Sequence, residues 1–136
     1  MEINAYLFFD GRCEEAVEFY RRELGAEVTM MMRFKDCPEP LPPGMVPPGW
    51  ENKVMHSALR IGETVVMASD DCQGRPKFDG FALSVTVPTE AEADRVFAAI
   101  TDGGKVTMPL GKSFFAKSFG MAHDRFGVHW MVIAPA

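Results

Sequence analysis

The stretches GAEVTM, residues 25–30, and GGKVTM, residues 103–108, share four identical positions and begin 78 residues apart. Each opens with a glycine, which can end a helix, and continues with a Val-Thr pair, which favours a strand. The same offset places Phe97 on Phe19, inside the apolar segment that precedes each stretch. Coincidence is an alternative explanation, because glycine stops and Val-Thr strands are common. We interpret the match as an internal structural repeat.

The first copy of the repeat has the pattern of a strand, a helix and three further strands. Residues 3–9 are apolar on both strand faces, and the apolar positions within residues 13–24 recur at helical spacing. Glu14 and Glu15 fall in the first turn of that helix, where the helix dipole favours acidic side chains. The three further strands are predicted over residues 28–34, 53–61 and 64–68.

The second copy has the same order of elements. Thr89 and Glu92 form a Thr-x-x-Glu capping box that predicts the start of a helix, and the glycine pair at residues 103–104 ends it. The predicted strands cover residues 81–87, 105–108, 114–119 and 128–133. The sequence therefore predicts an α+β fold of two βαβββ modules in a single domain over residues 1–136, with module one at residues 1–70 and module two at residues 80–136.

One segment, residues 35–52, has no counterpart in the second copy. It holds six prolines together with Gly44, Gly49 and Trp50. Prolines at that density exclude regular strand pairing and favour an extended, semi-rigid chain. Three interpretations stay open: a plain linker, a lid over a pocket, or an arm across a partner subunit.

Charge and hydropathy narrow the classes of partner. The chain carries 14 Lys and Arg against 19 Asp and Glu, a net charge of -5, which disfavours a nucleic-acid partner. No apolar run approaches the roughly 18 residues of a membrane span, and no signal peptide is evident at the start. We expect a cytoplasmic protein that binds neither membranes nor nucleic acid.

The cysteines are three in number, Cys13, Cys37 and Cys72, and they lack CxxC spacing. An odd count without that spacing argues against a disulfide framework and against a thiolate zinc site. We interpret them as reduced thiols, with Cys13 on a helix face.

The paired modules resemble the glyoxalase/bleomycin-resistance superfamily, also called vicinal oxygen chelate, and within it the PhnB-like family. The matching residues include Glu18-Phe19-Tyr20 in the first helix and Asp124-Arg125-Phe126-Gly127-Val128 before the last strand; the other matching segments are residues 6–11, 56–62, 66–70, 118–121 and 130–131. The resemblance implies that each module curls its sheet into an open half-barrel with a pocket inside. It also implies a homodimer. It does not name an activity, because members of this superfamily include lyases, isomerases, dioxygenases, thiol transferases and drug-binding proteins.

The resemblance further implies four positions at which metal-using members place His or Glu. Here they match Ala5, Met67, Gly80 and Met131. Ala and Gly carry no donor, and a thioether suits copper(I) rather than zinc, nickel or magnesium. We therefore expect no tightly bound divalent metal and no cofactor at these positions.

Two histidines are candidate catalytic bases, His56 and His129, because imidazole is the side chain most easily poised near neutral pH. Isolated histidines more often serve as hydrogen-bonding residues at the edge of a core, and that alternative stays open. His123 falls in a predicted turn, which indicates a surface role. The candidate ligand-binding residues are Trp50, Met67, Phe115, Lys117 and Met131, although aromatic and Met side chains on strands also commonly serve as packing.

Two functional hypotheses follow. The first is a metal-independent protein that binds a small, partly apolar molecule. The second is a lyase or isomerase type of enzyme that uses His56 or His129 as a general base, with Arg60, Lys117 or Arg125 holding an anion. A methyltransferase is rejected, because the turn after the first strand is Asp10-Gly11-Arg12-Cys13 and lacks the glycine-rich G-x-G pattern.

Overall fold

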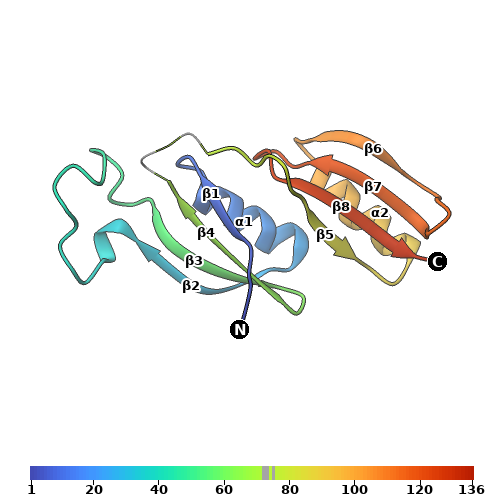
Figure 1. The fold of residues 1–136 in the computed structure, drawn as a ribbon, viewed down its shortest axis with the longest axis horizontal. Coiled ribbons are helices and arrows are strands. Elements are labelled where there is room, and N and C mark those ends of the chain that lie inside the picture. The colour runs from blue at the N-terminus through green and yellow to red at the C-terminus, as the bar shows by residue number, and fades with distance from the viewer. Residues whose placement is uncertain (72–73, 75) are drawn as a thin grey trace. The chain divides into compact units, whose positions relative to one another are not determined.

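The computed structural model of the chain describes residues 1–71, 74 and 76–136. Cys72 lies outside the described residues. The chain divides into two compact units, Met1–Lys77 and Phe78–Ala136. The first unit contains β1 (Tyr6–Phe9), α1 (Cys13–Leu24), β2 (Glu27–Arg33), the 3-10 turn η1 (Phe34–Asp36), β3 (Val54–Ile61) and β4 (Thr64–Asp70). The second unit contains β5 (Leu83–Thr86), α2 (Glu90–Thr101), β6 (Lys105–Gly111), β7 (Ala116–His123) and β8 (His129–Pro135) (Figure 1).

The two units have the same sheet topology. The strand order is β1-β4-β3-β2 in the first and β5-β8-β7-β6 in the second. In each sheet the first strand runs parallel to the last, while the other pairs are antiparallel. Two βαβββ modules are therefore present, and the predicted fold class is confirmed.

The helix boundaries follow the sequence signals. α1 ends at Gly25, whose φ of 67° lies in the left-handed region that favours glycine. α2 begins after Thr89, whose hydroxyl oxygen accepts a hydrogen bond from the Glu92 backbone N–H at 3.1 Å. Both helices thus begin and end within a residue or two of the predicted positions.

The strand boundaries differ more from the predicted ones, because a strand extends only as far as its partner strand pairs with it. The first strand is predicted to start at residue 3, but β1 covers only the residues that pair with β4. β7 runs to His123, four residues beyond its prediction, because its pairing with β8 continues to the His123–His129 pair. His123 is therefore the last residue of a strand, and the predicted turn position for it is wrong.

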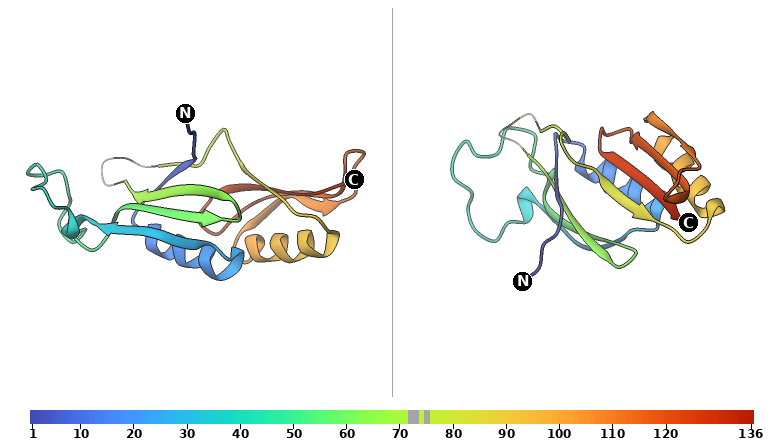
Figure 2. Two further views of the ribbon diagram at one scale, coloured as in Figure 1. Left: turned by 90° about the horizontal axis from the view of Figure 1, so that it is seen from below. Right: turned by 45° about the vertical axis from the view of Figure 1, so that its right-hand side comes forward.

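Each helix packs against one face of its own sheet, as the left view of Figure 2 shows. In the first unit the largest buried side chains include Phe19 and Tyr20 of α1, Leu7 of β1 and Leu59 of β3. In the second unit the buried side chains of α2 include Val96, Phe97 and Ile100, and those of β8 include Trp130 and Val132. Burial of these apolar side chains is the main stabilising contribution in each unit.

Two buried carboxylates hold backbone groups that the sheets leave unpaired. In the first unit, Asp70 accepts hydrogen bonds from the N–H of Cys13 at 2.9 Å and of Val54 at 3.0 Å. It therefore joins the end of β4 to the starts of α1 and β3. A buried carboxylate that accepts such bonds stabilises the fold, because both partners would otherwise lose hydration without compensation.

Asp124 performs the corresponding task in the second unit. Its carboxylate accepts from the N–H of Phe126 at 2.9 Å, the N–H of Val128 at 3.0 Å and the indole Nε1–H of Trp130 at 2.9 Å. These three bonds shape the turn between β7 and β8. The motif from Asp124 to Val128 is thus explained by turn geometry.

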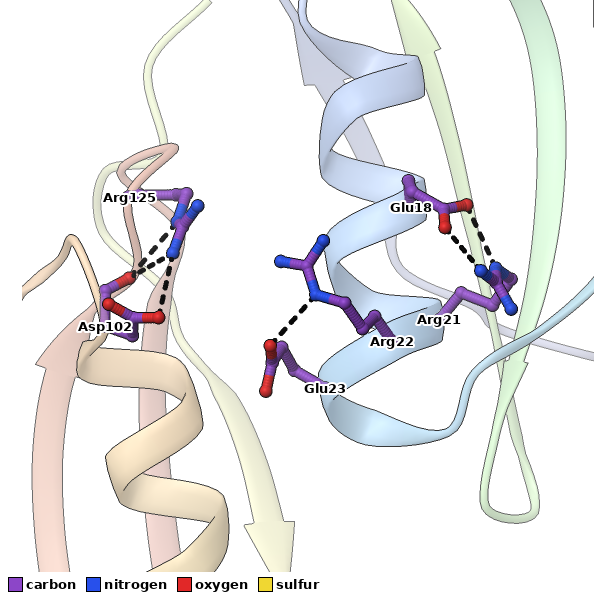
Figure 3. A network of polar contacts seen from close by, with 6 residues as sticks. All are labelled: Glu18, Arg21, Arg22, Glu23, Asp102 and Arg125. Carbon is purple, nitrogen blue, oxygen red and sulfur yellow. Dashed lines mark hydrogen bonds and ion pairs between the residues drawn. The ribbon is translucent and has the colours of Figure 1, made fainter.

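The charged side chains on the helix surfaces form exposed ion pairs. On α1, Glu18 pairs with Arg21 and Arg22 pairs with Glu23; in the second unit, Arg125 lies 3.2 Å from Asp102 (Figure 3). Pairs at this exposure contribute little to stability, about 0–1 kcal/mol each.

Residues 35–52 form a loop whose two ends are bonded together. The Phe34 N–H donates to the Lys53 carbonyl at 3.1 Å, and the Lys35 N–H donates to the Glu51 carbonyl at 3.0 Å. Between these ends the loop curls around a hollow of about 210 Å³, lined by Phe34, Lys35, Leu41, Pro42, Gly44, Val46 and Glu51. The segment therefore folds largely on itself.

The free cysteines in the described part of the chain include Cys13 and Cys37. Cys13 is fully buried on the face of α1 that meets the sheet. Burial, assisted by the negative charge of Asp70, raises the pKa of the Cys13 thiol to about 12. That thiol stays protonated at neutral pH and acts as a packing residue.

Candidate functional site

In each sheet, side chains alternate between the face that the helix covers and the face turned away from it, which we call the open face. In β1, Leu7 and Phe9 are buried under α1, whereas Tyr6 is partly exposed and Phe8 is 47% exposed. The side chains of the first open face are Tyr6, Phe8, Met30, Met32, His56, Ala58 and Met67, together with Ser69, Val65 and the pair Glu27 and Arg60 at the far end. Those of the second open face are Ser84, Thr86, Lys105, Met108, Lys117, Phe119, Met121, His123, His129, Met131 and Ile133.

The register of the first sheet places four of these side chains in one row. Tyr6 lies opposite Met67, Met67 opposite Ala58, and Ala58 opposite Met30. Directly opposite side chains on one face lie about 5 Å apart at Cβ. The row is therefore a continuous and mainly apolar surface.

A polar pair interrupts this apolar surface. The Tyr6 hydroxyl and His56 Nδ1 are 2.9 Å apart and form a hydrogen bond, although the two residues are 50 positions apart in the sequence. The Tyr6 ring also stacks on Phe8, with ring centroids 4.8 Å apart. Phenol and imidazole together can donate to a ligand, accept from it, or pass a proton between them.

The structure thus gives His56 a partner that the sequence-based candidates did not include. Tyr6 lies next to Ala5, the residue that the superfamily match identified. Shifting that match by one residue would have selected Tyr6. The Met67 N–H donates to the Ala5 carbonyl at 3.0 Å, while the side chain opposite Met67 is that of Tyr6. The residue that accepts the backbone hydrogen bond and the residue that lies opposite Met67 are therefore neighbours in the sequence.

The corresponding position in the second sheet is Ser84. It lies directly opposite Met131, whereas Gly80 precedes β5 and belongs to no strand. Ala5 and Gly80 therefore do not lie opposite Met67 and Met131, and the residues that do are Tyr6 and Ser84. Each sheet then presents one hydroxyl and one thioether at its pair of positions, with neither a carboxylate nor an imidazole.

His129 lies on the second open face, where its ring stacks on that of His123. The two ring centroids are 4.4 Å apart, with 12° between the planes. His123 Nδ1 lies 3.3 Å from the Gly127 carbonyl oxygen, and a hydrogen bond there requires a proton on Nδ1. His129 Nε2 is buried and has no hydrogen-bond partner among the residues that the structure describes.

The remaining candidates lie in different places. Phe115 is 45% exposed and meets Phe119 edge to face, with ring centroids 5.1 Å apart, and Lys117 is exposed on β7. Trp50 packs over Gly11, because a Cβ there would lie only 3.6 Å from Trp50 Cζ2. The contact ties the end of the Pro-rich loop to the connection between β1 and α1.

Within residues 1–71, 74 and 76–136, no cluster of three or more His, Cys, Asp or Glu side chains is arranged to hold a metal ion. In the same part of the chain, no helix is long and apolar enough to cross a membrane.

The two βαβββ modules have the fold of the glyoxalase/bleomycin-resistance class of proteins. A solved domain from Frankia sp. EAN1pec, described as glyoxylase/bleomycin resistance protein/dioxygenase, shares this fold with a TM-score of 0.70 at 11% identity; the alignment covers 100% of this chain and 98% of the Frankia chain. At that identity the likeness concerns the fold alone.

The chain belongs to the PhnB-like family, whose model is described as 3-demethylubiquinone-9 3-methyltransferase and matches residues 1–133. It is 33% identical to Protein YjdN of Escherichia coli K12, over 97% of this chain and 94% of that protein. The solved protein PA1353 from Pseudomonas aeruginosa is 42% identical, with a TM-score of 0.87 over 99% of this chain and 98% of that one. A Bacillus cereus structure, described as a putative 3-demethylubiquinone-9 3-methyltransferase, PhnB protein, is 29% identical, with a TM-score of 0.78 over 98% and 99% of the two chains.

Proposed function

We propose that the chain binds a small, partly apolar organic molecule on the first open face without the help of a divalent metal. The observation that carries this proposal is the Tyr6–His56 hydrogen bond within a surface of Met and Phe side chains. Small-molecule sites commonly combine an apolar lining with a few placed polar groups that orient the ligand. Met67 and Met30 supply a lining that adapts to shape, since the thioether side chain is flexible and polarisable.

Independence from a divalent metal is supported by the donor atoms at the two pairs of opposite residues on the first and last strands of the sheets. In the first sheet these are the Tyr6 phenol and the Met67 thioether, and in the second the Ser84 hydroxyl and the Met131 thioether. Zinc prefers thiolate, imidazole and carboxylate, and magnesium prefers carboxylate oxygens. The ligand would accordingly be held by hydrogen bonds and apolar contact.

An enzyme of the lyase or isomerase type is the second candidate, and the same hydrogen bond favours it. When Tyr6 donates its hydroxyl proton to His56 Nδ1, the imidazole carries its own proton on Nε2. A substrate bound beside this pair could then exchange a proton with the phenol or the imidazole. Turnover that depends on both Tyr6 and His56 would separate this candidate from simple binding.

Methyl transfer is not part of the proposal, although the family description mentions it. Residues 10–12 connect β1 to α1, and Arg12 stands at the start of the helix. A glycine-rich turn at such a connection is what cradles a nucleotide-like cofactor in the usual methyltransferase fold, and the residues here are Asp, Gly and Arg.

We also retain the homodimer as part of the proposal. Phe8 is 47% exposed and Met30 is 38% exposed, and exposed apolar residues gathered on one sheet face often mark an interface or a ligand site. Sedimentation that finds only monomer at micromolar concentration would remove the dimer and leave the ligand-binding proposal intact.

A thermal-shift screen of small organic acids, phenols and quinones tests the binding proposal, using protein freed of metal by chelation. A ligand that binds the folded state raises the transition temperature. For each hit, His56→Ala and Tyr6→Phe should weaken binding, while Phe114→Ala, an exposed residue of the other unit, should leave it unchanged. Hits whose affinity requires added zinc or nickel, or ignores both first-face variants, would overturn the proposal.

Trp50→Ala separates two of the three interpretations of the Pro-rich loop, a lid over the pocket and an arm across a partner subunit. Because Trp50 packs over Gly11, next to the strand that carries Tyr6, its loss should weaken ligand binding and leave any dimer intact. Unchanged affinity together with a dissociated dimer would assign the loop to the subunit interface.

A further inference from the structure

We propose that His129, Met121 and Met131 form a binding site for a soft monovalent metal ion, Cu(I) or its mimic Ag(I), on the second open face. Its residues all belong to the second unit, and its argument does not rest on the ligand site proposed for the first open face. It also differs in kind from the divalent metal site of the superfamily, because its donors are two thioethers and one imidazole.

The sheet register brings the three donors together. Met121 of β7 lies directly opposite Met131 of β8, and His129 precedes Met131 by two residues on the same strand. Residues two apart on a strand share a face and lie about 7 Å apart, while opposite residues lie about 5 Å apart at Cβ. Met and His side chains are long enough to converge on one ion above the centre of this triangle.

The state of His129 is the second observation that points to an ion. Its Nε2 is buried and lacks a hydrogen-bond partner in the described part of the chain. A buried polar atom without a hydrogen-bond partner lowers the stability of the folded state by roughly 1–3 kcal/mol. Its presence in a folded protein therefore requires an explanation. In the tautomer that carries its proton on Nδ1, this nitrogen offers a lone pair that can ligate a desolvated metal ion.

His123 holds the His129 ring in place. The two imidazoles stack at 4.4 Å, and the His123 ring is itself oriented by its contact with the Gly127 carbonyl. A neighbour that fixes the orientation of a ligating imidazole is a regular feature of metal sites. His123 is therefore a positioning residue here and not a ligand.

The charge of the site selects the ion. Two of the three donors are thioethers, which carry no charge, and Lys105 lies opposite His123 at the edge of the same face. Neutral thioether and imidazole ligands suit Cu(I) and Ag(I), which accept soft donors and low coordination numbers, whereas divalent ions such as Mg²⁺ or Ca²⁺ require oxygen ligands. The site should consequently take Ag(I) and reject Zn²⁺ at comparable concentration.

The probe for the experiment is Ag⁺, which has the ligand preferences of Cu(I) without its redox chemistry. Thiols also bind Ag⁺, so the full chain is used with Cys37→Ser and Cys72→Ser; Cys13 is retained, because it is fully buried and its pKa is about 12. Calorimetric titration should give one Ag⁺ per chain. In spectra of protein with ¹³C-methyl methionine, two of the ten methionine signals should move, and the variants assign them to Met121 and Met131.

Matched variants then test the ligands. Met121→Leu and Met131→Leu should each weaken Ag⁺ binding by at least about tenfold, and His129→Gln by a similar factor, as expected for the loss of one ligand. Met45→Leu, in the Pro-rich loop, should leave the affinity within about twofold. Leucine preserves volume, and the thermal transition of each variant verifies that it folds.

Two results would overturn the site. One is unchanged Ag⁺ affinity in the Met121→Leu/Met131→Leu double variant. The other, which needs no variant, is a titration of the parent protein in which neither methionine signal responds to one equivalent of Ag⁺.

Discussion

The two modules repeat one topology but differ at matched positions, and the clearest case is the residue after each helix. The offset of 78 residues aligns Ala26 with Gly104. Ala26 is buried without difficulty at 4% exposure, whereas a Cβ at Gly104 would lie 2.2 Å from the backbone oxygen of His123. The same connection therefore permits a side chain in one module and excludes it in the other, because the backbone of the β7–β8 turn approaches closely.

The open faces differ in chemistry in the same way. The first presents a hydrogen-bonded phenol and imidazole at Tyr6 and His56, and the second presents stacked imidazoles beside two thioethers. The faces that meet the helices are both lined by buried apolar side chains. The comparison teaches that the repeat specifies the fold through the covered faces, while the open faces are free to carry different sites.

The largest effect should come from Gly104→Ala. The added methyl group meets backbone, which cannot rotate away, so we expect a loss of about 2–4 kcal/mol in the free energy of unfolding. Ala26→Gly at the aligned position should cost only about 1 kcal/mol. Urea unfolding followed by circular dichroism measures both. Equal losses for the two variants would show that the modules do not differ at this connection.

Substitutions of the two buried carboxylates, Asp70 and Asp124, should have the second largest effect on stability. Asp70→Asn turns one accepting oxygen into a donor that faces a backbone N–H, and Asp124→Asn turns one into a donor that faces either backbone N–H groups or the indole N–H of Trp130, at a cost of about 2 kcal/mol each. Amide hydrogen exchange should localise the damage, with faster exchange at Cys13 and Val54 for the first variant and at Phe126 and Val128 for the second.

The control for this pair is Asp94→Asn on the exposed surface of α2, which should change neither stability nor exchange. Faster exchange that spreads evenly over both units after either substitution would contradict the local role assigned to the two carboxylates.

A third comparison concerns the matched register positions Tyr6 and Ser84. Tyr6→Phe removes the hydroxyl that bonds to His56, and it should lower the affinity for a first-face ligand by about tenfold, equivalent to about 1.4 kcal/mol. Ser84→Ala should alter that affinity by less than about twofold. Fluorescence or calorimetric titration with a ligand found in the thermal-shift screen measures both affinities. Equal changes for Tyr6→Phe and Ser84→Ala would place the ligand elsewhere.

The smallest effect should follow from the ion pair between Glu14 of α1 and Arg33 of β2. The hydrogen bond from Arg33 lowers the pKa of Glu14 below its usual value. A lowered pKa in the folded state stabilises the protein above the pKa of the unfolded chain, near 4.5, and this contribution is lost as the pH falls through the folded value.

Glu14→Gln should accordingly cost about 0.5 kcal/mol at pH 7, since Glu14 is 59% exposed and solvent screens the pair. Urea unfolding at pH 7 and at pH 3 should show this difference at the higher pH only. A constant difference at both values would mean that packing, and not charge, accounts for the loss.

Much of the fold could be predicted because its signals are local. The helix stop at Gly25 and the helix start at Thr89 depend on residues within one turn, and both are confirmed. Strand ends were less accurate, because a strand extends as far as its partner pairs with it. His123 was placed in a turn for this reason, although pairing with His129 makes it part of β7.

The candidate site was predictable in part. His56 and Met67 were selected from strand position and the family resemblance, and the structure places both on the first open face. Tyr6 was missed as a partner of His56, because nothing local connects residues 50 positions apart. Whether these residues bind a ligand stays a prediction, as do the roles of Trp50, Phe115 and Lys117.

The sequence by itself determined the number of modules, the order of their elements and the side chains that each helix buries, since these follow from glycine stops, caps and hydrophobic periodicity. Only the tertiary structure decided which open-face residues meet, such as Tyr6 with His56 and Met121 with Met131. The physical reason is that periodicity assigns a residue to a face, whereas register depends on pairing between distant strands, and a shift of one residue exchanges the two faces.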